Sequence, residues 1–212
     1  LTDYKGGMSI QEKKYLYSIN NNQNIYIINQ EIFKNIPGQV IAYWATPRLL
    51  ETFQSSKKIS DYGIARQGMT TSDNKRFLRL WYEVDINKAN FNARNLVEAK
   101  ESKLKWFPYN KGGAFRKWYG NNEYFVNFYN DGEEMEKFHK ELNKTSSGGR
   151  IKSKEYYFKE SITWTFISSS SFGVRYSRPG AIFDVAGSSL FVNNNIYYIL
   201  GFLCTKLVEI YN

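Results

Sequence analysis

The sequence contains very little cysteine or histidine. Its 212 residues include a single cysteine, Cys204, and a single histidine, His139. A lone thiol has no partner for a disulfide, a metal clip or a redox pair, so the sequence does not support a secreted, disulfide-stabilised protein. One histidine excludes a metal site built from several imidazoles. Because His139 lies in a segment expected to form a solvent-facing acidic helix, we do not expect it to be catalytic.

The sequence also lacks a hydrophobic run that could cross a membrane. The longest apolar stretch, near the C-terminus, is interrupted by Gly201 and Lys206, whereas a spanning helix needs about 20 predominantly apolar residues. No basic segment followed by an apolar segment opens the chain. Together with the lone thiol, these absences predict a cytoplasmic protein, and the abrupt start at Leu1 suggests a cut edge.

Two enzyme motifs are missing as well. No glycine-rich turn opens a predicted helix, where backbone amides could hold the phosphates of a nucleotide. An adenine N6-methyltransferase also needs an Asn/Asp-Pro-Pro-aromatic motif to hold the exocyclic amine. The nearest string, at 107–110 (FPYN), has neither the leading amide or carboxylate nor the second proline. We therefore expect no catalytic site and no cofactor in this chain.

One nuclease-like pattern stays open as a less favoured alternative. Asp85, Glu98 and Lys100 match the loose Asp…Glu-x-Lys spacing of metal-dependent nucleases, in which clustered carboxylates hold a catalytic Mg²⁺. The spacing is common by chance, and Glu98 and Lys100 fall in a charged helical segment instead of a strand. We therefore expect no metal site.

Aromatic and basic residues, by contrast, are abundant. Aromatic residues make up 17% of the chain and hydrophobic residues 42%, which indicates a folded protein with a sizeable core. The net charge of +9 is unevenly distributed, because basic residues outnumber acidic ones in 57–120 and 144–178 but not in 121–143. Segregated basic regions rich in aromatic, Asn and Gly residues are typical of surfaces that bind a phosphate backbone. From charge alone, an ordinary basic surface is an equally good account.

The order of predicted elements indicates an α+β fold. Short strands with a helix near each end favour curved antiparallel or mixed sheets with flanking helices, and disfavour a doubly wound nucleotide-binding fold. Residues 1–30 are expected to form a lead-in with one short strand at 24–28, and residues 31–212 to form the main domain. Within that domain we expect helices at 40–53, 133–142 and 195–211, a hairpin-like pair of strands at 59–67 and 76–84, and strands at 124–128, 162–167, 173–176, 182–185 and 189–192. The terminal helix is expected to pack on a sheet through Tyr198, Ile199, Phe202, Leu203 and Val208.

The strongest candidate for a binding site is the loop at residues 106–120, WFPYNKGGAFRKWYG. Its basic side chains could reach phosphates or guanine acceptors, its glycines would let the backbone approach a phosphate closely, and its aromatic rings could stack. The candidate contacts are Lys111, Gly112, Gly113, Arg116, Lys117 and Tyr119. For Trp106, Phe107, Phe115 and Trp118 we favour a role as core anchors of the loop.

A second candidate is the turn at residues 66–76, RQGMTTSDNKR. From a hairpin tip, its amide and guanidinium groups could make bidentate contacts with base edges, although a solvated turn is an equally good account. The candidate contacts are Arg66, Gln67, Asn74, Lys75 and Arg76. A third basic group surrounds Ser177 and contributes Arg175 as a candidate contact, with Arg178 beside it.

Six strings of the sequence resemble one protein family. They are FKNIPGQVIAYW (33–44), ARQGMTTSDNKRFLRLWYEV (65–84), KWFPYNKGGAFRKWYGNNEYFVN (105–127), YYFKESITWTFISSSSFGVRY (156–176), IFDVAGSSLF (182–191) and YYILGFLCTKL (197–207). In order, and over roughly residues 24–212, they resemble the C-terminal half of the PglX family of adenine-specific DNA methyltransferases. That family serves BREX phage-exclusion systems, which defend against phage, and is related to type IIG restriction-modification enzymes. The strings WFPYNKGG and FRKWYGN are too specific to arise readily by chance.

The resemblance implies the target recognition domain of such an enzyme without its chemistry. In that family the N-terminal portion carries the S-adenosylmethionine site and the Asn-Pro-Pro-Tyr motif, so the parent protein would use S-adenosylmethionine and this chain would not. The chain would grip double-stranded DNA beside the target adenine, which must be flipped into the catalytic domain. Its implied partners are double-stranded DNA, the N-terminal methyltransferase domain of the same parent chain and other defence proteins. A protein-docking platform that uses the acidic loop at 131–136 stays open as an alternative.

Overall fold

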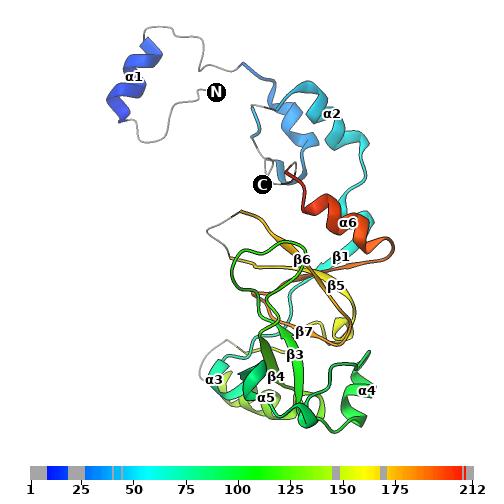
Figure 1. Ribbon diagram of the computed structural model, residues 1–212. Coiled ribbons are helices and arrows are strands. Elements are labelled where there is room, and N and C mark those ends of the chain that lie inside the picture. Colours follow the sequence, from blue (N-terminus) through cyan, green and yellow to red (C-terminus); the bar gives the residue numbers. More distant parts are fainter. Residues whose placement is uncertain are drawn as a thin grey trace. The chain divides into compact units, whose positions relative to one another are not determined.

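The computed structural model describes residues 9–18, 27–39, 41–43, 45–144, 149–167, 171–206 and 208 (Figure 1). The chain divides into two compact units, Leu1–Lys58 and Ile59–Asn212. This division falls later than the boundary between residues 30 and 31 that the sequence suggested. The predicted strand at 24–28 lies partly outside the described residues, and residues 27 and 28 are not in a strand.

The unit Leu1–Lys58 is built from short helices. They are α1 (Ile10–Ser18), the 3-10 helices η2 (Gln30–Asn35) and η3 (Pro37–Gln39), and α2 (Pro47–Ser55). Helix α2 begins later than the predicted helix at 40–53, because Pro47 fits the first helical position, where it costs no hydrogen bond. Thr46 caps this start, with its Oγ1 accepting a hydrogen bond from the Leu49 amide at 3.3 Å.

The described residues of the unit Ile59–Asn212 form two four-stranded sheets. The first has the order β1-β8-β5-β6 and is antiparallel throughout, with β1 at Gly63–Arg66, β8 at Ser189–Val192, β5 at Ser161–Trp164 and β6 at Val174–Ser177. The second has the order β2-β4-β3-β7, with β2 at Leu78–Leu80, β4 at Tyr124–Asn127, β3 at Trp106–Asn110 and β7 at Ile182–Phe183. It is mixed, because β3 and β7 are parallel. The predicted α+β class and the later strands are confirmed.

Short helices connect and flank these sheets. They are η4 (Ile59–Asp61), α3 (Asn74–Phe77), η5 (Trp81–Glu83), η6 (Ile86–Lys88), α4 (Leu96–Glu101), α5 (Tyr129–Leu142), η7 (Lys154–Tyr156) and α6 (Ile196–Leu203). Figure 1 shows α6 beside β1, β5 and β6, and α3, α4 and α5 around β3 and β4. No helix among the described residues is long and apolar enough to cross a membrane.

The predicted hairpin at 59–67 and 76–84 is wrong. Strand β1 pairs with β8 in the first sheet, and β2 pairs with β4 in the second. The intervening segment crosses between the sheets because fully buried Met69 is fixed beside β7, its amide donating to Phe183 O at 3.1 Å and its carbonyl accepting from Val185 N at 3.0 Å. Asp73 then caps α3 by accepting from the Arg76 amide at 3.0 Å, so the segment forms a helix start and not a hairpin tip.

Each sheet has its own core. The core beside the second sheet is mainly aromatic and includes Phe77, Phe107, Tyr109, Phe128, Tyr157 and Phe158. The core beside the first sheet is mainly aliphatic and is built from Ile162, Val174, Leu190, Ile196, Ile199, Leu200 and Cys204. The lone cysteine is therefore buried, and its burial raises the pKa of the thiol.

The prediction of which face of the terminal helix packs is partly wrong. Ile196, Ile199 and Leu200 are the buried residues of α6, because a spacing of three and four places them on one face. Phe202 is 45% exposed and Tyr198 72% exposed, on the other side of the helix. Of the predicted anchors, Ile199 is confirmed, and Leu203 is partly buried against the second core.

His139 is buried and does not face solvent as predicted. Only 4% of it is exposed, and its Nε2 lies 3.3 Å from Thr71 O. It lies four residues after fully buried Met135 in α5, so both occupy the inward face of the helix. The side chain thus helps to join α5 to the segment that precedes α3.

Candidate nucleic-acid interface

A large open cleft lies where the two sheets approach each other. Its volume is about 1290 Å³. Pro108 and Phe125 line it from β3 and β4 of the second sheet, and Tyr176 and Ser177 line it from β6 of the first. Tyr197 of α6 completes this wall. The cleft therefore depends on the packing of both sheets.

Three basic side chains line this cleft. They are Arg94, Lys159 and Arg178, all of which are exposed. Within the described part of the chain, none of the three forms an ion pair. The Arg178 guanidinium lies 5.9 Å from the centre of the Tyr119 ring, a cation–π arrangement that orients it. The positive charge of the cleft is thus available to an anion.

The cleft contains one carboxylate among its lining residues, Glu160. It accepts a hydrogen bond from the Tyr176 hydroxyl at 2.9 Å. Burial raises the pKa of Tyr176, and its hydrogen bonds with Tyr197 and Glu160 raise it further, so the hydroxyl stays protonated as a donor. One engaged carboxylate against three cations leaves the cleft positive.

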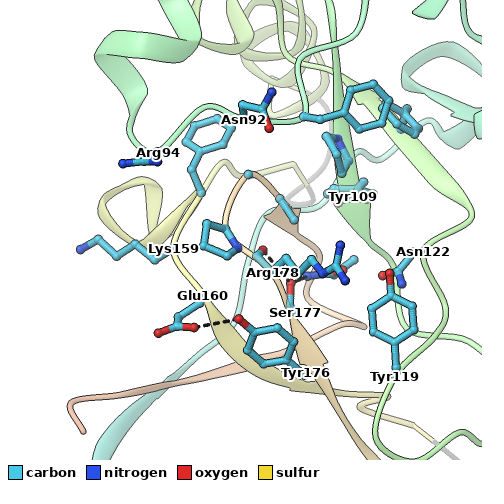
Figure 2. Close-up of a pocket in the computed structure, with 18 of the residues that line it drawn as sticks. Asn92, Arg94, Tyr109, Tyr119, Asn122, Lys159, Glu160, Tyr176, Ser177 and Arg178 are labelled. Atoms are coloured by element: carbon cyan, nitrogen blue, oxygen red, sulfur yellow. Dashed lines mark hydrogen bonds between the residues drawn. The ribbon is translucent and has the colours of Figure 1, made fainter. Parts of the chain in front are cut away.

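Aromatic and amide groups complete the lining. Trp81, Phe91 and Tyr119 join Tyr176 and Tyr197, while Asn92 and Asn122 contribute amides. Figure 2 shows Asn92 and Arg94 on one side of the cleft, and Tyr119 and Tyr176 on the other, with Arg178 between them. Cations beside aromatic and amide groups are the functional groups with which proteins hold phosphates, base faces and base edges.

The predicted loop at 106–120 divides between the core and this cleft. Tyr119 is 56% exposed and lines the cleft. Lys111, in contrast, forms an ion pair with Asp184, with 2.7 Å between Nζ and Oδ2, and Asp184 is almost wholly buried. The Tyr109 hydroxyl donates to the same oxygen at 2.6 Å. Burial, and then the charge of Asp184, raise the pKa of Tyr109 well above its usual value, so this hydroxyl stays a donor.

The glycines of the loop serve its backbone geometry. Gly112 has φ 82° and is buried, and a Cβ there would lie 2.6 Å from Ala186 O. Gly112 therefore allows close approach to the backbone of the protein itself, and this packing explains the glycine without a bound phosphate. Gly113 is exposed with φ 132°, and its carbonyl accepts a hydrogen bond from Thr165 Oγ1 at 2.9 Å.

The remaining predicted contacts of the loop differ in exposure. Arg116 is exposed. Lys117 is partly buried, and its Nζ donates to Cys204 O at 3.1 Å. Among the aromatic residues, Phe107 is fully buried as an anchor, whereas Trp118 is 55% exposed. Trp118 is held by its backbone, whose amide donates to Val174 O at 3.0 Å and whose carbonyl accepts from Tyr176 N at 2.8 Å.

Arg175 lies in the interior and not on the surface. Only 1% of the residue is exposed, and its Nε has no hydrogen-bond partner among the described residues. One terminal nitrogen lies 3.4 Å from Thr165 Oγ1. Burial lowers the pKa of its guanidinium. Its neighbour Arg178 is the side chain of this predicted basic group that reaches the cleft.

The predicted turn at 66–76 keeps two of its side chains engaged with the protein. The Arg66 guanidinium lies 5.3 Å from the centre of the Tyr156 ring. Arg76 forms an ion pair with Glu134, with 2.9 Å between Nε and Oε1. Gln67 is exposed, and its backbone carbonyl accepts a hydrogen bond from Ser153 Oγ at 2.9 Å.

Three predicted contacts from the two regions meet in a smaller hollow. Asn74, Lys75 and Lys111 line a space of about 470 Å³ together with Arg79 and one carboxylate, Glu83. Arg79 is turned to the backbone, where one of its terminal nitrogens donates to Lys75 O at 2.7 Å and to Leu78 O at 2.6 Å. This basic hollow thus unites parts of both predicted regions, while Tyr119 belongs to the cleft.

The nuclease-like pattern does not form a cluster of ligands. Asp85 caps η6 and pairs with Lys88, while Glu98 accepts from the amide of Arg94 at the start of α4. No group of three or more metal-ligating side chains occurs among the residues described. Both carboxylates therefore have local roles at helix starts, which account for their position.

Sequence reasoning missed most of the cleft. The cleft also contains Asn92 and Arg94 from the loop before α4, Asn122 from the loop before β4 and Lys159 from the loop before β5, and none of these is among the predicted contacts. One signal was present in the sequence, because Asn122 directly follows the predicted loop at 106–120. The others come together only through the packing of the two sheets.

Proteins similar to this chain are adenine-specific methyltransferases. Adenine-specific methyltransferase PglX of Lacticaseibacillus casei (strain Zhang) is 41% identical over 203 residues, which make up 91% of this chain and 16% of that protein. Adenine-specific methyltransferase BrxX of Escherichia coli O9:H4 (strain HS) is 39% identical over 185 residues, or 85% of this chain and 14% of that protein. No protein-family model matches the chain. The resemblance to PglX methyltransferases that the sequence indicated is thus confirmed.

The similarity covers most of this chain but little of the relatives. The chain spans about one sixth of the length of the curated relatives that it matches. The part compared is therefore one segment of a much longer protein in both relatives.

Proposed function

We propose that this chain is the DNA-recognition module of an adenine-specific (N6) DNA methyltransferase of a BREX or restriction-modification type of phage defence. The observation that carries the proposal is the positive cleft. Arg94, Lys159 and Arg178 have no ion-pair partner within the described residues, and they surround aromatic and amide groups. Folding does not require these exposed groups, whereas DNA offers phosphates to the cations, base edges to the amides and base faces to the aromatic rings.

Two kinds of side chain in the cleft would make different contacts with DNA. The three cations would hold phosphates, which fixes the register of the duplex without reading sequence. Asn92 and Asn122 would contribute the hydrogen bonds to base edges, since a side-chain amide pairs best with adenine. The basic hollow around Asn74 and Lys75 would extend the contact with phosphates.

The chemistry would reside in the rest of the parent protein. Under this proposal the parent binds S-adenosylmethionine and transfers its methyl group, while this chain is non-catalytic and selects which adenine is presented. Flipping of that adenine into a catalytic domain requires a firm grip on the neighbouring duplex. The partners of the chain are then double-stranded DNA, the methyltransferase domain of the same parent and other defence proteins.

The docking alternative would use the acidic segment at 131–136. Asp131 and Glu136 both bind Lys154, at 3.1 and 2.7 Å, and Glu134 binds Arg76. Because these carboxylates are neutralised within the fold, little negative charge is left to attract a basic partner. The contacts within the chain therefore favour the DNA module over the docking platform.

Binding of duplex DNA over a range of salt concentrations tests the proposal. The wild-type chain should bind duplex DNA with an affinity that falls steeply as salt rises, and Arg94→Ala should reduce the log–log slope by about 0.9, the value for one lost phosphate contact. Lys137→Ala is the matched control, because Lys137 is an exposed cation paired with Glu133 on α5, outside the cleft. Salt-independent binding, or equal losses in both variants, would contradict the assignment of the cleft.

A further inference from the structure

Large aromatic side chains of the cleft remain exposed although ordered elements carry them. Trp81 begins η5 directly after β2, and Tyr197 lies in α6. They are 63% and 67% exposed. Leaving such surfaces in water forgoes the free energy that burying them would contribute. Core packing therefore does not account for their position at the cleft.

Neighbouring side chains hold two of the exposed rings in place. The rings of Tyr176 and Tyr197 are 5.4 Å apart between centroids with an interplanar angle of 38°, and Arg178 lies over Tyr119. A ring that is already fixed loses little conformational entropy when a ligand stacks on it. The arrangement suits flat ligands that present a face.

The amides beside these rings are available for hydrogen bonds. Within the described residues, the side chains of Asn92 and Asn122 have no hydrogen bond to the protein, although both line the cleft. An amide offers both a donor and an acceptor, which matches the edge of a nucleobase better than a phosphate. The cleft therefore holds groups for the face and for the edge of the same base.

Paired DNA cannot use all of these groups. In a duplex the faces of the bases are stacked on one another and only their edges are accessible, so aromatic side chains stack on bases that have left the stack. The cleft volume of about 1290 Å³ is also larger than the usual 300–1000 Å³ of a small-molecule site. It offers room for more than one nucleotide.

Resting on the proposed function, we propose that the cleft binds unpaired nucleotides adjoining the recognised duplex. Their bases stack on Tyr119, Tyr197 and Trp81, and their edges meet Asn92 and Asn122. The three cations of the cleft hold the phosphates at the junction between the duplex and these nucleotides. An enzyme that flips a base leaves the opposite nucleotide unpaired, so the reaction of the parent protein would itself supply this ligand.

Two DNA duplexes of the same length separate this inference from simple duplex binding. One is fully paired, and the other carries a bulge of a few unpaired nucleotides at its centre. Fluorescence anisotropy with the 212-residue chain should show tighter binding of the bulged duplex, by about 5- to 100-fold, which corresponds to stacking of one base. Thermal melting followed by circular dichroism would verify that every variant used in this comparison is folded.

Adjacent aromatic residues provide matched controls for this preference. Tyr197→Ala should abolish the preference for the bulged duplex, whereas Tyr198→Ala should keep it, because Tyr198 is equally exposed on α6 but does not line the cleft. Trp81→Ala, in η5, should also abolish the preference. Because Trp81 and Tyr197 lie in different elements, the same result from both variants would exclude local distortion of one helix as its cause.

The outcomes distinguish the two levels of the proposal. Equal affinity for both duplexes, with the steep salt dependence retained, would overturn the inference about unpaired nucleotides and leave the duplex-binding function standing. Equal effects of Tyr197→Ala and Tyr198→Ala would also overturn it. Absence of salt-sensitive binding to either duplex would instead overturn the proposed function.

Discussion

Lys111 and Arg178 illustrate two different uses of a basic side chain in this fold. Lys111 is 25% exposed and is bound at 2.7 Å to Asp184, a carboxylate that is almost wholly buried. Arg178 is exposed in the cleft, and its guanidinium contacts an aromatic ring and no carboxylate among the described residues. One cation completes the interior and the other is available to a ligand. The difference shows that the surroundings of a basic residue decide whether it serves the fold or faces a ligand.

The same division separates apolar residues on the last helix. Ile199 is buried in the aliphatic core, whereas Phe202, three positions later, is 45% exposed. The larger apolar side chain is thus the more exposed of the two. The helix face on which a residue lies decides whether it is buried, just as the position of Lys111 beside Asp184 decides its role.

The largest expected effect comes from Lys111→Ala. Removal of the cation leaves Asp184 buried without its counter-charge, which should cost about 3–5 kcal/mol of unfolding free energy. Urea unfolding followed by circular dichroism measures the cost. The double variant Lys111→Ala/Asp184→Asn should lose less stability than the sum of the two single variants, because it removes both charges. If Lys111→Ala were as stable as wild type and bound all DNA sequences more weakly, Lys111 would be the phosphate contact that the sequence predicted.

A somewhat smaller effect is expected from Ile199→Ala. Because Ile199 is 2% exposed, its truncation should leave a cavity and cost about 2–4 kcal/mol. Phe202→Ala is the control on the same helix and should cost about 1 kcal/mol or less, since much of that ring already meets water. Thermal melting of both variants makes the comparison. Equal losses would indicate that the exposed face of α6 is covered by another element.

Arg178→Ala should affect binding and leave folding unchanged. Loss of one charge-assisted phosphate contact is expected to weaken DNA binding by about 1–2 kcal/mol, while the melting temperature stays near that of wild type because no buried group loses its partner. Titration of labelled duplex at low salt gives the affinity. Tyr119→Phe keeps the ring beneath Arg178 and serves as the mild control. A variant that melts early would place Arg178 with Lys111 as a structural cation.

Local patterns predicted much of the fold but only part of the candidate site. The α+β class and the strands at 189–192 and 124–128 follow from short apolar runs between turns, which are local signals. The partner of β1 could not be predicted, because β8 lies more than a hundred residues away in the sequence. The position of Lys111 beside Asp184 depends on the same long-range packing, in which β7 runs parallel to β3.

The cleft was hard to predict for the same reason. Tyr119 could be selected because it lies in a loop with several cations, but Arg94 and Lys159 come from segments whose local sequence is unremarkable. Conversely, Arg175 is as basic as Arg178 but lies within β6, where its neighbour Val174 is buried as well, whereas Arg178 follows the end of the strand and is exposed. The charged residues of a sequence therefore indicate that a basic surface exists, but they do not identify which residues form it.

The smallest expected effect concerns Arg76, a predicted base-reading residue that Glu134 holds. The hydrogen bond from Arg76 lowers the pKa of Glu134 below its usual value of 4.5, so the pair should stabilise the fold above about pH 4.5 and lose this contribution as the pH falls through the lowered folded pKa. Both side chains are roughly half exposed, so solvent screening limits the gain to about 0.3–1 kcal/mol. Urea unfolding of wild type and Glu134→Gln should differ by that amount at pH 7 and converge in acid. A difference that stays constant with pH would show that the substitution acts through packing and not through charge. If Glu134→Gln also tightened DNA binding, Arg76 would belong with Arg178 as a cation that a ligand can recruit.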